Sequence, residues 1–170
     1  AFDLMWAKAN NDNGKGYNKV RNATVAFTFG HCLSKLTMNC KLDASVGVAN
    51  LDGAKVTIHG MNTVSTFDLK TGKQHGTPEN PADITPRKLA TANFDATYDA
   101  IILPAGYSAG AVTVDFEIGS DTYTWNVDTV TFEAGNEYIY EVEITRSNVK
   151  VTGTINPWNP VTHQGPVYAE

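Results

Sequence analysis

The sequence is poor in charge and lacks long apolar runs, and each shortage argues against a class of protein. Charged residues make up 18% of the 170 residues, the net charge is -5, and Lys and Arg form no cluster. Nucleic-acid binding needs concentrated positive charge, so no nucleic-acid partner is expected. No apolar run approaches the roughly 20 residues of a membrane-spanning helix, so no transmembrane segment is predicted.

Cysteine is also scarce, with only Cys32 and Cys40 present. They do not form a Cys-x-x-Cys pair. Alternation from Leu36 through Met38 points Cys40 into a core, whereas Cys32 belongs to a different local structure. Two reduced, buried thiols are therefore favoured over a disulfide. Residues 1–6 lack the charged and apolar regions of a signal peptide, so an exported form of this chain is expected to be mature or truncated.

What the sequence does contain is a two-residue alternation of apolar and polar side chains, which is typical of half-buried β-strands. Turn signals such as Asp52-Gly53, Gly60 and Gly119-Ser120 separate the segments. No stretch of about 12 residues has a helical period. Roughly nine or ten strands at this spacing predict an all-β fold of antiparallel sheets, arranged as a sandwich or barrel. The expected strands are 25–29, 36–42, 55–59, 64–69, 89–94, 98–103, 112–118, 122–127, 138–145 and 149–155.

Three segments lack this alternation. Residues 10–16 are polar and Gly-rich, and residues 72–88 carry three prolines and are predicted to be a long connection. The tail beyond Trp158 contains Pro160 and Pro166 and is not expected to form a central strand. We therefore expect a lead-in strand and polar loop at 1–19, one β-sandwich domain at 20–158 and a Pro-containing tail at 159–170.

One motif matches a catalytic pattern, the Gly-x-Ser-x-Gly of residues 106–110 with Ser108 at its centre. The hydrolase nucleophile elbow requires a helix directly after the serine. Here the following residues alternate as a strand, so a hairpin loop of small residues is predicted instead. The carboxylates Asp115, Glu117, Glu141 and Glu143 alternate outward and are interpreted as a solvated sheet face. No catalytic residue, and no enzyme, is predicted.

No metal or cofactor site is predicted either. Zinc needs several ligands at close spacing, and none of the four histidines lies near another in sequence; they are His31, His59, His75 and His163. Residues 11–14 (Asn-Asp-Asn-Gly) lack the alternating ligands and the closing Glu of a calcium loop. They are interpreted as a Gly-rich turn.

Two segments carry a resemblance to a known family. Residues 25–36 (VAFTFGHCLSKL) resemble the "F-x-H-x-L-S-K-L" strand end of Bacteroidales fimbrillins, the Mfa-like group. Residues 132–140, with 149–151 and 155–158, look like that family's closing "F-x-x-G-x-x-Y-x-Y … I-x-V … I-x-x-W". A bulge or helical turn after His31 would bury Leu33 and Leu36 and leave Ser34 and Lys35 outside. His31 is interpreted as structural, and Trp158 as packing over the end of the sandwich.

The resemblance implies an antiparallel Greek-key sandwich of transthyretin type, behind a lipidated precursor segment that this chain lacks. It implies a location at the cell surface, in a fimbrium associated with the outer membrane. Family members exchange strands with other fimbrial subunits after a protease removes an N-terminal strand. The Pro-containing tail is expected to be a poor donor strand, and the sequence is compatible with a shaft, an anchor or a tip role.

The leading hypothesis is thus a non-enzymatic pilus or adhesion subunit. The alternative is a surface module that binds carbohydrate or a host ligand, such as surface glycans or proteins. Sugar sites usually present exposed aromatic rings, and the loop aromatics available for that purpose are Tyr17, Tyr107 and Tyr168.

Overall fold

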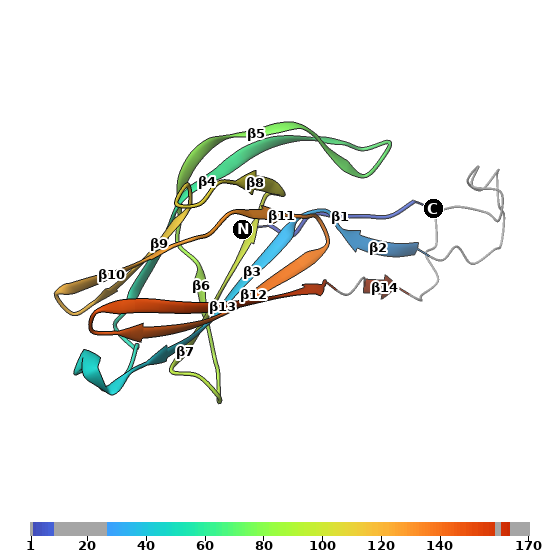
Figure 1. The fold of residues 1–170 in the computed structure, drawn as a ribbon. Helices are drawn as coiled ribbons and strands as arrows, with labels where there is room; N and C mark the ends of the chain where they lie inside the picture. Colours follow the sequence, from blue (N-terminus) through green and yellow to red (C-terminus); the bar gives the residue numbers. More distant parts are fainter. Residues whose placement is uncertain (1, 9–26, 159–160, 164–170) are drawn as a thin grey trace.

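The computed structural model is built almost wholly of β-strands, and it describes residues 2–8, 27–158 and 161–163 (Figure 1). The one helical element in these ranges is a turn of 3-10 helix, η1 (Ala44–Val46). The all-β prediction is confirmed. The strands are β1 (Met5–Trp6), β2 (Phe27–His31), β3 (Ser34–Leu42), β4 (Lys55–Asp68), β5 (Lys73–Ile84), β6 (Arg87–Leu89), β7 (Ala96–Ile102), β8 (Ala105–Tyr107), β9 (Thr113–Ile118), β10 (Asp121–Asn126), β11 (Val130–Phe132), β12 (Asn136–Thr145), β13 (Asn148–Pro157) and β14 (Val161–His163).

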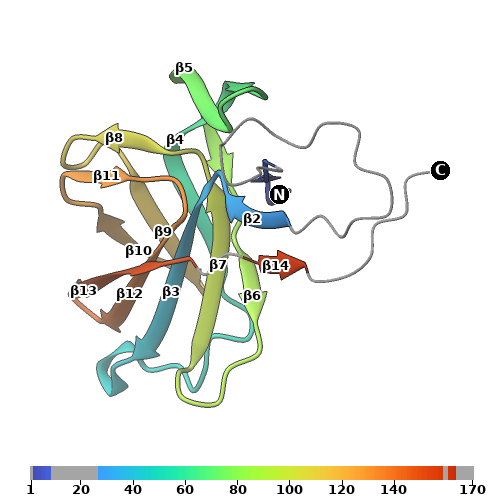
Figure 2. The same ribbon diagram turned by 90° about the vertical axis from the view of Figure 1, so that its right-hand side faces the viewer.

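Two larger sheets enclose the core (Figures 1 and 2). One sheet has the order β13-β12-β3-β7-β6 and the other the order β10-β9-β4-β5. Most neighbours are antiparallel, as predicted, but β3 and β12 run parallel. Alternation alone could not predict this pair, because it fixes which side chains share a face and leaves the direction of the partner strand open.

Two smaller sheets complete the described part of the chain. β11 pairs with β8, and β2 lies between β1 and β14. The β1-β2-β14 sheet lies at one end of the molecule, where the tip of the β4–β5 hairpin also lies (Figure 1). The Trp6 indole nitrogen donates to the carbonyl of Leu69 at 2.9 Å, which ties the N-terminal segment to that tip.

The core is formed by the inward faces that the alternation predicted. On β9, Val114 and Phe116 are fully buried between half-buried neighbours, and β12 contributes Tyr138, Val142 and Ile144 from the opposite sheet. Burying each such side chain contributes roughly 1.5–3 kcal/mol, so packing of the two sheets is the main source of stability.

The prediction of a long connection at 72–88 is wrong, because most of it forms β5. This strand is the outer member of its sheet, so a proline whose missing N–H would point outward removes no ladder hydrogen bond. The pairing of β5 with β4 also shifts register twice, and Asn80 adopts a φ of 58°. An irregular edge strand can therefore include Pro78 and Pro81, which a central strand could not.

Three further predictions need correction. Gly60 does not end a strand but lies inside β4, with a φ of 80° at the first register shift. The strand expected at 89–94 ends at Leu89. Ser34 is buried instead of exposed, because its hydroxyl donates to the carbonyl of Glu133 at 2.7 Å. A serine satisfied by a backbone carbonyl can be buried at little cost.

Both cysteines are buried free thiols. Between Ser34 and Cys40 the chain runs as one extended strand, which spans about 20 Å at roughly 3.3 Å per residue. A disulfide requires Cα atoms within about 7 Å, so Cys32 and Cys40 cannot reach each other. Burial raises the pKa of the Cys40 thiol to about 12, and the nearby Asp95 carboxylate adds to this effect.

Within the ranges that the structure describes, no helix has the length and the apolar character of a membrane span.

Candidate functional site: the groove between β10 and β13

The open edges of the two larger sheets are the main candidates for a functional surface. An edge strand carries unpaired backbone N–H and C=O groups that can pair with another chain. Two of the four edges are protected, since β5 is irregular and carries prolines, and β6 has only three residues. The remaining edges are β10 and β13.

β13 is the longest unprotected edge in the described part of the chain. It has ten residues and pairs only with β12 there. Asn148 faces Thr145 across the turn, so by alternation the backbone groups of Val151, Gly153 and Ile155 point away from β12. The Val149 amide points the same way but donates to the Asn148 side chain at 2.8 Å. The Ile155 side chain is 60% exposed. The backbone groups of Val151, Gly153 and Ile155 thus have no partner strand among the described residues.

Two cavities lie along the neighbouring strands β10 and β13, and together they form a groove with one aromatic end. The rings of Trp125 and Tyr140 lie 4.8 Å apart and border a small cavity of about 160 Å³. Gly153 forms part of the floor, and a Cβ added there would come within 2.8 Å of Cε1 of Tyr140. Burial raises the pKa of the Tyr140 phenol. A larger side chain at position 153 would therefore displace Tyr140 and fill this end of the groove.

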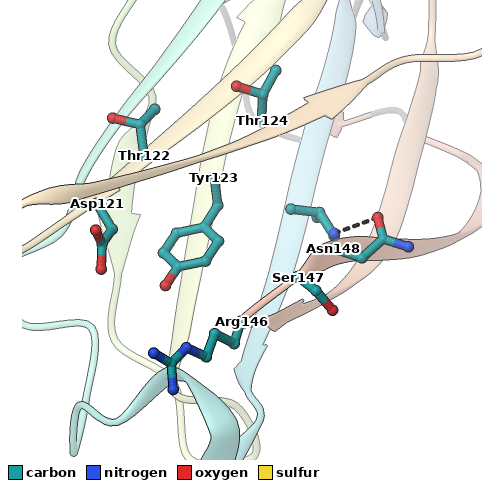
Figure 3. A pocket seen from close by; sticks show the side chains of 8 residues that line it. Asp121, Thr122, Tyr123, Thr124, Arg146, Ser147 and Asn148 are labelled. Carbon is teal, nitrogen blue, oxygen red and sulfur yellow. Dashed lines mark hydrogen bonds between the residues drawn. The ribbon is translucent and has the colours of Figure 1, made fainter.

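The other end of the groove is polar and more open. A cavity of about 460 Å³ lies between β10 and the turn that joins β12 to β13 (Figure 3). Figure 3 shows the Tyr123 ring extending from β10, with the carboxylate of Asp121 to one side of it and the guanidinium of Arg146 below its hydroxyl end. The residues that line the cavity are Asp121, Thr122, Tyr123, Thr124, Arg146, Ser147, Asn148 and Val149.

Ser108 is not positioned as a nucleophile. It is exposed in the loop between β8 and β9, and a strand follows it where the elbow needs a helix. Tyr107 is not a loop aromatic, which corrects the expectation. It lies in β8, its hydroxyl accepts from the Asn62 amide at 3.0 Å, and its ring packs edge-on against Phe132. Tyr17 and Tyr168 lie outside the described residues.

His31 and Trp158 form a stacked pair at the end of the molecule that holds β1 and β2. Their ring centroids are 3.6 Å apart with planes inclined by 2°. His31 Nδ1 also lies 2.9 Å from Asp3 Oδ2, and the His31 side chain is only 6% exposed. The ring therefore joins residues from both ends of the described chain. This arrangement agrees with the structural roles predicted for both residues.

His59 occupies the outer face of the four-stranded sheet between two aspartates. Its Nδ1 lies 2.7 Å from Asp83 on β5, and its Nε2 lies 3.3 Å from Asp115 on β9. The hydrogen bond to Asp83 raises the pKa of His59, and the negative charges of both aspartates act in the same direction. Protonated His59 thus links three neighbouring strands.

The other candidate ligands lie apart. His75 is exposed on β5, and the Asn-Asp-Asn-Gly turn lies outside the described residues. His163 belongs to β14. Glu143 is paired with Lys150 on the neighbouring strand at 3.0 Å. Among the described residues no group of three His, Cys, Asp or Glu side chains is arranged to hold a metal ion.

Sequence reasoning missed the groove. Each strand that borders it was predicted, but the groove exists because β10 and β13 end their respective sheets on the same side of the molecule. Strand order is not encoded in the alternation of a single strand. The turn residues Arg146 and Ser147 gave no signal of their own.

Residues 1–158 match the family model described as fimbrillin-like. The chain is also 29% identical over 143 residues to Fim1C of Bacteroides uniformis, whose name describes a fimbrium subunit. That match covers 80% of this chain and 46% of Fim1C, so the chain spans about half the length of this curated relative.

Solved structures share the fold. A protein from Bacteroides uniformis described as a cell adhesion protein superposes with a TM-score of 0.65 at 19% identity, over 91% of this chain and 66% of its own. The tip fimbrial protein Mfa3 from Porphyromonas gingivalis superposes with a TM-score of 0.53 at 12% identity, over 76% of this chain and 52% of its own.

Proposed function

The chain belongs to the fimbrillin-like family, and on that basis we propose that it is a non-enzymatic subunit or adhesin of a bacterial surface fimbria that binds neighbouring subunits by strand exchange. The observation that carries the proposal is the outer edge of β13, which pairs with no strand among the described residues. A strand added there would extend the five-stranded sheet with backbone hydrogen bonds, while its side chains fixed the register.

Several side chains favour β13 over the other edges. Val149 and Val151 are half-buried on its inner face and pack against the core. Ile155 follows on the same face but is largely exposed. An incoming apolar side chain placed beside Ile155 would cover surface that the chain leaves in contact with water. Burial of such a side chain is worth roughly 1.5–3 kcal/mol.

We also propose the finer features that the family resemblance implies. They are a Greek-key, transthyretin-like arrangement, a domain at 20–158 flanked by a lead-in segment at 1–19 and a tail at 159–170, and attachment to the outer membrane through a lipidated precursor segment. The absence of an enzymatic role is supported by the exposed loop position of Ser108.

A matched pair of lysine substitutions on β13 tests the proposal. In Ile155→Lys, a charge enters the face that an added strand would cover, so we expect the processed full-length protein to lose most of its assembly into fibres. Thr154→Lys places the same charge on the opposite, exposed face and should leave assembly unchanged. Assembly is measured by sedimentation and electron microscopy.

Both substituted residues are exposed, so neither change should unfold the domain. If both variants assemble as well as the unmodified protein, β13 is not the edge at which subunits dock. If the processed full-length protein stays monomeric under every condition, the proposal of strand exchange is wrong.

A further inference from the structure

The polar end of the groove has the size of a small-molecule site and lies at the turn end of β13, whereas strand exchange would use the edge from Val151 to Ile155. Its volume of about 460 Å³ falls within the roughly 300–1,000 Å³ of ligand pockets. The cavity is bordered by β10 on one side and by the β12–β13 turn on the other (Figure 3). Both walls belong to tight two-residue hairpins, at 119–120 and 146–147, which fix the backbone positions of the lining residues.

Two charged groups in this cavity have no charged partner of their own. Neither Arg146 nor Asp121 forms an ion pair within the ranges that the structure describes. The guanidinium offers several N–H donors in one plane, and the carboxylate offers acceptors only. A ligand that both donates and accepts hydrogen bonds would therefore satisfy both groups at once.

The neighbouring side chains add an oriented donor and an aromatic surface. The Asn148 side-chain oxygen accepts a hydrogen bond from the Val149 backbone amide. The side-chain nitrogen of Asn148 can therefore act as a donor to a ligand. Tyr123 packs against the core but remains half-exposed, so part of its ring faces the cavity. The Thr124 hydroxyl is engaged elsewhere, since it donates to Asp115 at 2.6 Å.

We propose that this cavity binds a neutral glycan. A pyranose ring presents adjacent hydroxyls, which both donate and accept, together with a face of C–H groups that can pack on an aromatic ring. Arg146 and Asn148 supply donors, Asp121 supplies acceptors, and Tyr123 supplies the ring.

Other ligand classes fit less well. An anionic ligand that paired with Arg146 would also meet the carboxylate of Asp121. An extended peptide needs a row of apolar sockets, and this end of the groove offers only Tyr123 and Val149. The aromatic end, around Trp125 and Tyr140, is the better surface for a strand.

A glycan array tests the proposal, with the 170-residue chain applied to neutral oligosaccharides that end in a hexose or an N-acetylhexosamine. The tightest hit is then titrated into ¹⁵N-labelled protein. We expect shifts of the amide signals of residues 121–124 and 146–149. Arg146→Ala and Asp121→Asn should each weaken binding by at least about tenfold, or about 1.4 kcal/mol. Lys70→Ala removes an exposed charge far along the chain at the β4–β5 turn and should have no effect.

Binding to no neutral glycan would overturn the proposal, as would binding that survives both Arg146→Ala and Asp121→Asn. Shifts caused by an extended peptide at residues 121–124, with none caused by sugars, would show a strand site instead. The Ile155→Lys variant separates this proposal from the proposed function, because it should lose assembly and keep glycan binding.

Discussion

His59 is the residue at which a single proton has the clearest expected effect. It lies on β4 between Asp83 and Asp115, which belong to the strands on either side. Alternation with the buried Ile58 is enough to indicate an outward face for His59. The sequence could not predict Asp83 and Asp115 as partners of His59. They are 24 and 56 positions away, and their approach depends on the register of both neighbouring strands.

The raised pKa of His59 predicts a pH-dependent stability. A group whose pKa is higher in the folded state contributes stability that is complete below its unfolded value and is lost as the pH rises through its folded value. The unfolded value is about 6.5. The difference in Tm between the unmodified protein and His59→Gln should therefore be largest below about pH 6.5 and shrink above it.

Thermal unfolding of the two proteins at several pH values measures this difference. His75→Gln serves as the control, because the His75 side chain lies exposed on β5, in the same sheet. A His59 effect that stays constant from acidic to alkaline pH would contradict the ion-pair account.

Among the elements, the β4–β5 hairpin depends on a contact that is distant in sequence. Its turn contains Gly72, with a φ of 71°, and the Trp6 indole lies directly against it. A Cβ at this position would overlap the ring, whereas a Cβ at Gly76, whose φ is 80°, would meet only the Thr66 hydroxyl at 3.9 Å. The two glycines thus share the left-handed backbone but differ in the Trp6 contact.

Gly72→Ala and Gly76→Ala separate these two effects. Each should lose roughly 1–2 kcal/mol of unfolding free energy from the left-handed backbone. Gly72→Ala should lose about a further 1–3 kcal/mol, because the methyl group displaces Trp6. In a Trp6→Ala background the two costs should become equal, as a double-mutant cycle measured by urea unfolding would report. If Gly72→Ala still loses more unfolding free energy than Gly76→Ala in the Trp6→Ala background, the extra loss does not come from contact with Trp6.

The strands show what alternation can and cannot predict. Residues 112–118 and 138–145 were predicted nearly to their observed ends, because the core requires every second side chain. β5 was missed because an edge strand needs neither alternation nor a full set of amide donors. β8 and β11, with three residues each, were too short to show any period.

At the scale of the whole molecule, the two larger sheets approach each other along one side at their edge strands. β10 and β13 end their sheets next to each other, and the groove between them has an aromatic end and a polar end. The sequence predicted the fold class, the buried faces and the family. It could not predict the strand order, the parallel β3–β12 pair or the groove, which all depend on contacts between distant segments.

The central claim is that the outer edge of β13 pairs with a strand of a neighbouring subunit. Amide hydrogen exchange, read residue by residue in the free protein and in assembled fibres, tests it most directly. The amides of Val151, Gly153 and Ile155 should exchange rapidly in the free protein and become protected in fibres. Those of Thr152 and Thr154, which face β12, should be protected in both. Rapid exchange at the three outward amides within assembled fibres would contradict the claim.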